Sequence, residues 1–360
     1  MEVKRLVRAA DRDVVDLVSG RPDWDPPDAL RAGLREYADS DPPEFQYSEE
    51  RGLPALREEI AARRGVEEAG VVVTCGTVEA NYLAMARALE RDAGGAVLVP
   101  DPAYPYYPAR ARMLGAEVRR VPVGADGSLD PATVRDRADD DVAAITVTNP
   151  NNPTGAVYGE ATVRELVRIA EECDAVLVSD EVYSHFDRSG RFTSAVTVDS
   201  AHRVVTTGVS KSMAATGLRI GYAVVPPGLR ERTTMRHVLT TIAASRPAQH
   251  AVLRALRETP REYYAEARER TGRRADRLVA ALTEGGADVV RPEGSVYVFA
   301  RLPGVEGTLS GARRLVEGAG VAAMPGAAFG EVRRDWIRFA LTSDRVGTAA
   351  DRLSAFLADQ

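Results

Sequence analysis

The sequence predicts an α/β protein, and three observations support this fold class. Five short apolar segments rich in Val, Ile and Thr recur between residues 71 and 208, without polar alternation inside them. Amphipathic segments with apolar residues at three- and four-residue spacing separate them. Buried strands that alternate with helices are typical of a parallel sheet covered on both faces and joined by right-handed crossovers. The 360 residues suffice for one large domain or two packed ones.

The five predicted strands have the sequences VVVTC, AVLVP, AAITVT, AVLVS and RVVTTG. In chain order they occupy residues 71–75, 96–100, 143–148, 175–179 and 203–208. The intervening segments include EANYLAMARALERD and EATVRELVRIAEEC, whose apolar spacing predicts helices. Ligands of open α/β sheets bind outside the carboxyl ends of the strands. The residues directly after these five segments are therefore the candidate site residues.

The two ends of the chain differ from this central pattern. The first 40 residues include the Pro- and Asp-rich SGRPDWDPPDAL and are not expected to form a domain alone. After residue 228 a helical stretch leads into an arginine-rich helix at 260–283, and SVYVFARL and DWIRFALT then predict strands of a smaller α+β unit. We expect an N-terminal arm or part of the small domain at 1–40, a large domain at 41–240 and a small domain at 241–360.

Composition and charge narrow the function classes. Hydrophobic residues at 44% and charged residues at 28% are typical of a globular protein, and a net charge of −6 argues against a nucleic-acid partner. Two cysteines without a CxxC pair and four scattered histidines predict no metal site and fit a reducing cytoplasm. The charged N-terminus does not resemble a secretory signal, and no apolar run approaches the roughly 20 residues of a membrane span. We therefore expect a cytoplasmic protein without a membrane partner.

Lysine is nearly absent from this chain, so its positions are informative. Lysine and arginine together number 47, and only Lys4 and Lys211 are lysines. An arginine stays protonated at any workable pH, whereas a lysine amine can lose its proton and attack a carbonyl. Lys211 follows the fifth predicted strand, which favours an amine nucleophile over an ordinary surface lysine.

The first three strand ends carry further candidates. The turn GTVEAN would expose backbone N–H groups and a helix N-terminus suited to phosphate, although most such turns are only helix caps. The segment DPAYPYY supplies Tyr104, Tyr106 and Tyr107, which either pack the loop or lie against a planar aromatic ligand. The irregular loop NPNNPTG presents the amides of Asn151 and Asn152, and we favour a binding role over a simple turn.

The fourth strand end and the segment after the fifth complete the set. Asp180 and Tyr183 in DEVYSHF can reach one cleft, where a buried carboxylate would hold a ring nitrogen protonated; the alternative for Asp180 is a helix cap. Glu181 is expected to point away and serve structure. Arg219, eight residues after Lys211, could meet a phosphate or a carboxylate. A phosphate cradle, an aromatic face, a carboxylate, a tyrosine and a reactive lysine together describe a pyridoxal phosphate pocket.

These motifs resemble those of the class I/II aminotransferases of the fold-type I pyridoxal phosphate superfamily. The core motifs are NPNNPTG, SDEVY and SKSMAATGLRIGY, flanked by SGRPDW, YSEERGLPALREEIA, PEGSVYVF, PGAAFG and WIRFAL. The resemblance implies a large domain with a mostly parallel seven-stranded sheet sandwiched by helices, and a smaller α+β C-terminal domain. It also implies an aminotransferase that uses pyridoxal 5′-phosphate to move an amino group between an L-amino acid and a 2-oxo acid.

The resemblance implies roles around the cofactor ring. Lys211 would form the internal aldimine and then move a proton between the substrate Cα and C4′ of the cofactor. Asp180 would pair with the pyridine nitrogen, while Tyr183 and Asn152 would bond the phenolic oxygen. Tyr104 would stack on the ring. In this interpretation Lys211, Asp180 and Tyr183 are the catalytic residues.

The resemblance also implies how the phosphate and the substrate are held. The phosphate would contact the backbone of three residues and two side chains: Gly76, Thr77, Val78, Ser210 and Arg219. Tyr47 would reach the phosphate of the neighbouring subunit, which implies a homodimer with shared active sites. Arg338 would clamp the substrate α-carboxylate, helped by Gly20 and Asn152.

Two departures and several rival functions accompany this resemblance. Gly208 stands where the family often has serine, so one phosphate bond is missing, and SKSMAATG differs from the usual aromatic-Gly-Pro form of that loop. The same apparatus serves elimination, decarboxylation, oxidation and cyclisation in specialised biosynthetic pathways, which remain alternatives. A non-catalytic sensor domain is disfavoured by the retained Lys211, Asp180 and Arg338. A nicotinamide-binding enzyme is disfavoured because the first strand turn lacks GxGxxG.

Overall fold

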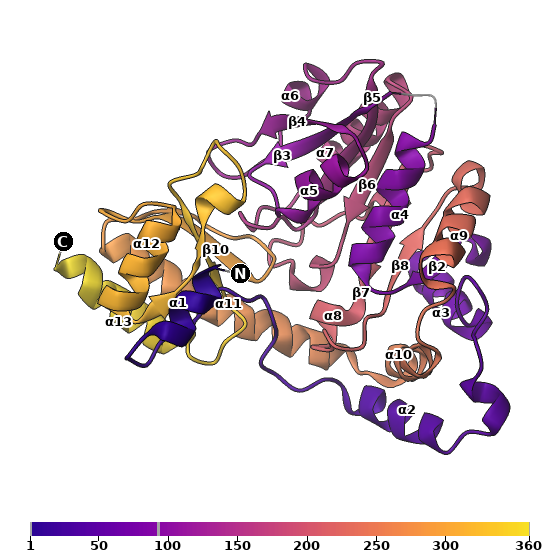
Figure 1. Ribbon diagram of the computed structural model, residues 1–360, viewed down its shortest axis with the longest axis horizontal. Coiled ribbons are helices and arrows are strands. Elements are labelled where there is room, and N and C mark those ends of the chain that lie inside the picture. The colour runs from indigo at the N-terminus through magenta and orange to yellow at the C-terminus, as the bar shows by residue number, and fades with distance from the viewer. Residues whose placement is uncertain (1, 92–93, 360) are drawn as a thin grey trace.

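A seven-stranded sheet forms the centre of the larger part of the molecule (Figure 1). The computed structural model describes residues 2–91 and 94–359. The strand order is β2-β8-β7-β6-β5-β3-β4, and β8 alone runs antiparallel to its neighbours. The strands are β2 (Val71–Thr74), β3 (Ala96–Asp101), β4 (Glu117–Pro122), β5 (Val142–Thr148), β6 (Val176–Asp180), β7 (Arg203–Gly208) and β8 (Gly221–Val224). The predicted mostly parallel sheet is confirmed.

The five apolar segments all form strands of this sheet, whereas β4 was not predicted. Its sequence EVRRVP lacks a continuous apolar run, and most of its residues are at least partly exposed. β4 lies at the edge of the sheet beside β3, where one side needs no partner strand. Charged side chains are common on such edges because they discourage pairing with other chains.

Helices cover both faces of the sheet. On one face Leu98 and Ile145 pack with residues of α7, and on the other Val97 and Val99 pack with residues of α4. Successive residues of a strand point to opposite faces, which explains why the strand segments are apolar throughout. The helices of this part are α2 (Asp28–Ala38), α3 (Pro54–Arg64), α4 (Thr77–Leu89), α5 (Tyr106–Met113), α6 (Pro131–Arg135), α7 (Glu160–Glu172), α8 (Val209–Ser212), α9 (Pro227–Thr241) and α10 (Arg246–Glu258).

A smaller α+β unit contains a four-stranded antiparallel sheet of order β12-β13-β10-β9. Its strands are β9 (Asp288–Val290), β10 (Tyr297–Arg301), β12 (Met324–Pro325) and β13 (Ile337–Ala340). Its helices are α11 (Arg261–Glu284), α12 (Leu309–Arg314) and α13 (Val346–Ala358), and a π-helical turn, η5 (Leu315–Ala319), follows α12.

Short 3-10 helices occur in both units. They are η1 (Pro42–Phe45), η2 (Glu68–Gly70), η3 (Ser184–Phe186), η4 (Ala195–Thr197) and η6 (Gly326–Ala328).

The N-terminal segment contributes to both units. α1 (Glu2–Ala9) packs beside α12, and β1 (Val15–Asp16) pairs in parallel with β11 (Val321–Ala322). α2 packs instead against α10, which shares an apolar cluster with α3 and β2. We therefore propose that the boundary between the domains lies after α10 and not at residue 240. No helix within the described residues is both long and apolar enough to span a bilayer.

Candidate functional site

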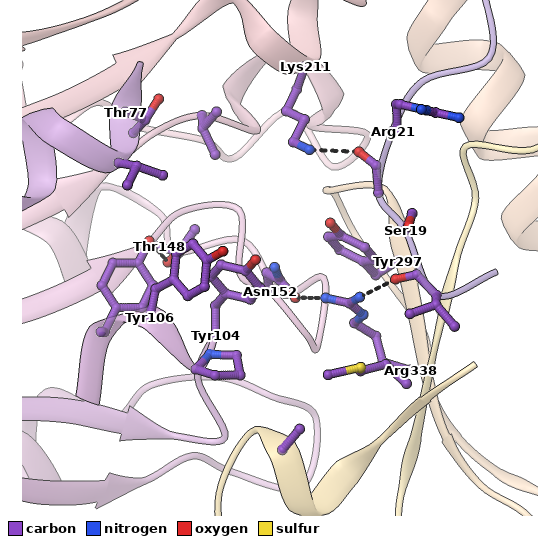
Figure 2. A pocket seen from close by; sticks show the side chains of 18 of the residues that line it. Ser19, Arg21, Thr77, Tyr104, Tyr106, Thr148, Asn152, Lys211, Tyr297 and Arg338 are labelled. Carbon is purple, nitrogen blue, oxygen red and sulfur yellow. Dashed lines mark hydrogen bonds between the residues drawn. The ribbon is translucent and has the colours of Figure 1, made fainter. Parts of the chain in front are cut away.

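A cavity of about 930 Å³ lies at the carboxyl ends of the large-sheet strands and reaches the smaller unit (Figure 2). Thr148 ends β5, Asp180 ends β6, and Lys211 belongs to the short helix that follows β7. Arg338 reaches the same cavity from β13 of the smaller unit. The predicted residues that line it are Gly20, Thr77, Val78, Tyr104, Asn152, Asp180, Tyr183, Ser210, Lys211, Arg219 and Arg338.

Three predicted residues do not line the cavity. Asn151 is buried within its own loop, where its amide oxygen accepts hydrogen bonds from the N–H of Thr154 at 3.2 Å and from the Thr154 hydroxyl at 2.9 Å. Gly76 directly precedes α4 as its N-cap residue, with a φ of 77°, next to the cavity-lining Thr77. Tyr47 is 78% exposed and belongs to the segment after η1. The reach of Tyr47 into a neighbouring subunit stays a prediction. Lys4, the second lysine of the chain, lines the same cavity as Lys211.

The Lys211 amine lies beside the N-terminal segment. Its Nζ donates a hydrogen bond of 2.6 Å to the carbonyl of Gly20. The preceding carbonyls also accept hydrogen bonds, because Arg338 donates to Val18 at 2.7 Å and Thr342 donates to Ser19 at 2.9 Å. Three consecutive carbonyls thus connect the lysine amine with the arginine of the smaller unit.

Asp180 is buried at the cavity wall with three hydrogen-bond donors around its carboxylate. Asn81 donates to Oδ2 at 2.6 Å, and the Tyr107 hydroxyl donates to the same oxygen at 2.7 Å. The backbone N–H of Val182 donates to Oδ1 at 3.0 Å. Burial raises the pKa of Asp180 above its ordinary value, and the hydrogen bonds from Tyr107, Asn81 and Val182 oppose that rise.

The groups that hold Asp180 were only partly predicted. Tyr107 was one of three loop tyrosines without a distinct role, and Asn81 was not singled out. The signal for Asn81 is its position inside an otherwise apolar stretch of α4, where it is 4% exposed. A buried amide needs partners, so such a residue within a helix indicates a polar neighbour across the interface.

Anion-binding groups gather where β2 turns into α4. The first N–H groups of a helix lack intrahelical acceptors and carry a partial positive charge. Arg219 donates to the Ser210 hydroxyl at 3.3 Å and to the carbonyl of Thr216 at 3.0 Å. The Thr77 hydroxyl is buried without a hydrogen-bond partner. An orphaned hydroxyl, a helix start and a guanidinium fit a phosphate group.

Glycines make this cradle narrow, and they explain the absence of serine at position 208. A Cβ on Gly208 would lie 2.6 Å from the Thr77 hydroxyl oxygen and 2.9 Å from the carbonyl oxygen of Ile220. A Cβ on Gly221 would lie 2.5 Å from the backbone nitrogen of Thr77. A serine side chain at position 208 would therefore collide with the hydroxyl group of Thr77.

Arg338 is held rigidly and is only 4% exposed. It donates to the amide oxygen of Asn152 at 3.1 Å, and its guanidinium lies 4.1 Å from the ring centroid of Tyr297 and 4.9 Å from that of Phe329. Figure 2 shows Arg338, Asn152 and Tyr297 together in the cavity. A planar, preorganised guanidinium is suited to bidentate binding of a carboxylate.

Tyr297 is a site residue that the sequence did not reveal. Its hydroxyl lies 3.1 Å from that of Tyr183, whose hydroxyl in turn lies 3.5 Å from the amide nitrogen of Asn152. Burial alone would raise the pKa of Tyr297, but the charges of Arg338 and Lys211 bring it below its ordinary value. Tyr297 lies in PEGSVYVF, which carries part of the resemblance, and in the predicted strand SVYVFARL, but neither pattern assigns this tyrosine a role.

Glu181 points away from the cavity, as predicted. It is fully buried and accepts hydrogen bonds from Arg64 at 3.0 Å and from the Ser194 hydroxyl at 2.7 Å. The N–H of Ala195 also donates to it, at 2.9 Å. These contacts join α3 and η4 to the end of β6 and are structural.

The chain is similar to known proteins over nearly its whole length. The family described as aminotransferase class I and II matches residues 12–353. Aspartate/prephenate aminotransferase of Thermus thermophilus is 34% identical, covering 96% of this chain and 91% of that protein. Aspartate aminotransferase of Thermotoga maritima is 31% identical, covering 99% and 94%.

Solved structures agree with this similarity. The aspartate aminotransferase of Thermus thermophilus with maleate superposes with a TM-score of 0.90 at 32% identity, covering 98% of this chain and 95% of that one. The aromatic aminotransferase of Pyrococcus horikoshii OT3 gives a TM-score of 0.89 at 28% identity, covering 100% and 99%. Both the sheet and the smaller unit are therefore shared with these proteins.

Proposed function

The chain belongs to the class I and II aminotransferases and transfers an amino group between an amino acid and a 2-oxo acid; from this premise we propose that it binds pyridoxal 5′-phosphate in the cavity through Lys211. When bound, this cofactor supplies an aldehyde that condenses with amines and a ring that withdraws electrons from the substrate Cα. The supporting observation is that a lysine amine, a buried carboxylate and the anion-binding groups Thr77, Ser210 and Arg219 line one cavity.

The described residues fit this cofactor from both ends. Five residues would hold the phosphate: Gly76, Thr77 and Val78 through their backbone, with Ser210 and Arg219. Asp180 would face the ring nitrogen and favour its protonated form by charge pairing. Tyr104 would cover the ring, and Tyr183 and Asn152 would contact the phenolic oxygen; Asn152 and Tyr183 already lie 3.5 Å apart.

Arg338 would orient the amino acid. Its contacts with Asn152 and Tyr297 leave little rotational freedom, so a carboxylate would meet a fixed guanidinium. The Gly20 segment lies between this arginine and the lysine amine. A substrate bound by its α-carboxylate at Arg338 would therefore present its Cα toward Lys211.

Lys211 would move the proton. Its amine, once free of the cofactor, would take a proton from the substrate Cα and return one to C4′ of the cofactor. The Gly20 carbonyl accepts a hydrogen bond from this amine and so orients it. A Cβ on Gly20 would lie 2.0 Å from the Tyr297 hydroxyl, which explains why only glycine fits there.

A homodimer is part of the proposal. Met235 and Leu239 are exposed and lie four residues apart near the end of α9, which places them on one helix side, and the exposed Ile242 directly follows the helix. Exposed apolar side chains that line up in this way indicate a surface covered by another protein. With Tyr47 exposed as well, a second copy of the chain would complete the cradle, and light scattering would measure the mass.

One labelling experiment tests the proposed attachment. After borohydride reduction of the cofactor-loaded protein, peptide mass analysis should find the cofactor on Lys211, and Lys211→Ala should lose it. Lys4→Ala is the matched control, because Lys4 is the other lysine and lines the same cavity. A reduced adduct that persists in Lys211→Ala would show that the assignment is wrong.

A further inference from the structure

Two hydrogen-bond chains converge on Asp180 from different elements of the fold. In the first, the Thr148 hydroxyl lies 2.8 Å from the Tyr107 hydroxyl, which lies 2.7 Å from Oδ2 of Asp180. In the second, the Thr206 hydroxyl lies 2.6 Å from Oδ1 of Asn81, whose Nδ2 lies 2.6 Å from the same Asp180 oxygen. Together the chains join β5, β7, α4 and α5 to the end of β6.

The chemistry of the groups fixes the direction of both chains. An ionised carboxylate only accepts hydrogen bonds, so the Tyr107 hydroxyl donates its proton to Asp180 and accepts from Thr148. The Thr206 hydroxyl donates to the amide oxygen of Asn81, which turns the amide NH₂ toward Asp180. The hydrogen bond from Thr148 therefore leaves Tyr107 as a donor to Asp180, and the hydrogen bond from Thr206 does the same for Asn81.

Burial makes these hydrogen bonds difficult to replace. Asp180, Tyr107, Asn81, Thr148 and Thr206 are all at most 5% exposed, so water does not readily replace a lost partner. A purely structural network would lie within the core. Here all but Thr206 also line the cavity, on the wall that carries Asp180.

We propose that Tyr107 and Asn81 are positioning residues that keep the Asp180 carboxylate ionised and oriented for a protonated ring nitrogen. Thr148 and Thr206 support them by fixing the direction of their hydrogen bonds. The inference rests on the proposed function, because Asp180 needs the nitrogen of the pyridoxal ring as its partner. Tyr107 and Asn81 touch neither the substrate nor the cofactor in this interpretation.

The opposing effects on Asp180 show why two donors are useful. Burial raises the pKa of Asp180, whereas the hydrogen bonds from Tyr107 and Asn81 lower it. The charge of Arg110, which also lines the cavity, acts in the same direction as these donors. Without a donor the carboxyl group would protonate more readily, and a neutral carboxyl group attracts a pyridinium weakly.

The experiment compares two cofactors in the full-length protein. After removal of bound cofactor, dissociation constants are measured for pyridoxal phosphate and for its deaza analogue, in which carbon replaces the ring nitrogen. Both carry the same aldehyde and phosphate, so their ratio isolates the contact with Asp180. We expect Tyr107→Phe and Asn81→Ala each to lower the preference for pyridoxal phosphate about tenfold.

Tyr158→Phe is the matched control. Tyr158 is also a buried tyrosine, but it packs with the apolar cluster beside α7 and does not line the cavity. Its preference ratio should equal that of the unaltered protein. Equal weakening of both cofactors in Tyr107→Phe and Asn81→Ala would show a structural role and overturn the inference. Failure of the unaltered protein to bind either cofactor would instead overturn the proposed function.

Discussion

Two buried carboxylates follow one another at the end of β6, and their surroundings differ sharply. Asp180 faces the cavity and is hydrogen-bonded by Tyr107, Asn81 and the N–H of Val182, all of which are neutral. Glu181 faces the core and is hydrogen-bonded by the cation Arg64 as well as by Ser194. Neighbouring residues of one strand end thus reach opposite sides of the structure.

The difference lies in the charge of the hydrogen-bond partners, and it separates an acid that serves structure from one that is available to a ligand. The charge of Glu181 is balanced inside the chain by Arg64, so it needs nothing further. The hydrogen-bond donors of Asp180 stabilise a negative charge without neutralising it, which leaves that charge for a cationic ligand. Both carboxylates are buried, but Glu181 has a cationic hydrogen-bond partner and Asp180 has only neutral ones.

Removal of the core carboxylate should have the largest effect on stability. Glu181→Ala leaves Arg64, whose side chain is 17% exposed, without its counter-charge and empties a fully buried site, and we expect the free energy of unfolding to fall by about 3 kcal/mol. Urea denaturation measures this change. Glu160→Ala, which breaks an exposed ion pair with Arg164, should cost about 0.5 kcal/mol or less. Equal losses in the two variants would contradict the contrast between buried and exposed acids.

Neutralising the cavity carboxylate should reduce catalysis far more than stability, although the new amide NH₂ would leave one of the surrounding donors without an acceptor. Asp180→Asn keeps the shape of the side chain but removes the charge, and we expect kcat to fall about 10²–10³-fold. The KM for the amino acid should change little, because Arg338 holds the carboxylate of the substrate in this proposal. Steady-state kinetics and thermal unfolding of the same samples test both parts. A variant with full kcat would remove Asp180 from the mechanism.

Substitution of the exposed Asp13 should have the smallest effect on stability, and it serves as the reference for the buried Glu181 and Asp180. Hydrogen bonds from Arg345 and Arg352 lower the pKa of Asp13 to about 2. A lowered pKa means that this contribution to stability is present above the ordinary pKa of about 4 and is lost as the pH falls toward 2. Asp13→Asn should therefore lower the melting temperature by about one degree at neutral pH, and the difference should shrink as the pH falls from about 4 through the folded pKa of about 2.

High salt supplies the check on the Asp13 prediction. Because Asp13 lies at the surface, salt should screen its attraction to Arg345 and reduce the difference between the variant and the unaltered protein. A difference that stays undiminished at pH 2 or in molar salt would point to a cause other than charge. Thermal melts over this range of pH and salt measure it.

The sequence alone revealed most of the strands and the motif-bearing loops. Continuous apolar segments such as 143–148 indicate strands buried on both faces, and the residues after them do meet at one cavity. This succeeds because the carboxyl ends of parallel strands lie at a common edge. The charged strand β4 escaped prediction because an edge strand need not be apolar.

Several features depended on contacts between segments far apart in the chain. Asn81 and Tyr107 reach Asp180 only because α4, α5 and β6 converge, and Tyr297 joins the site from the smaller unit. The Thr77 hydroxyl, more than 100 residues away in sequence, leaves no room for a side chain at position 208. Local patterns carry no information about such partners.

The residue types and their order along the chain by themselves indicated the lysine, the acid and the arginine that the proposed chemistry requires. The folded chain alone decided which groups surround each of the two adjacent acids, such as Asn81 and Tyr107 beside Asp180. The physical reason is that side-chain chemistry is a local property, whereas burial and hydrogen-bond partnership arise only when distant segments pack together.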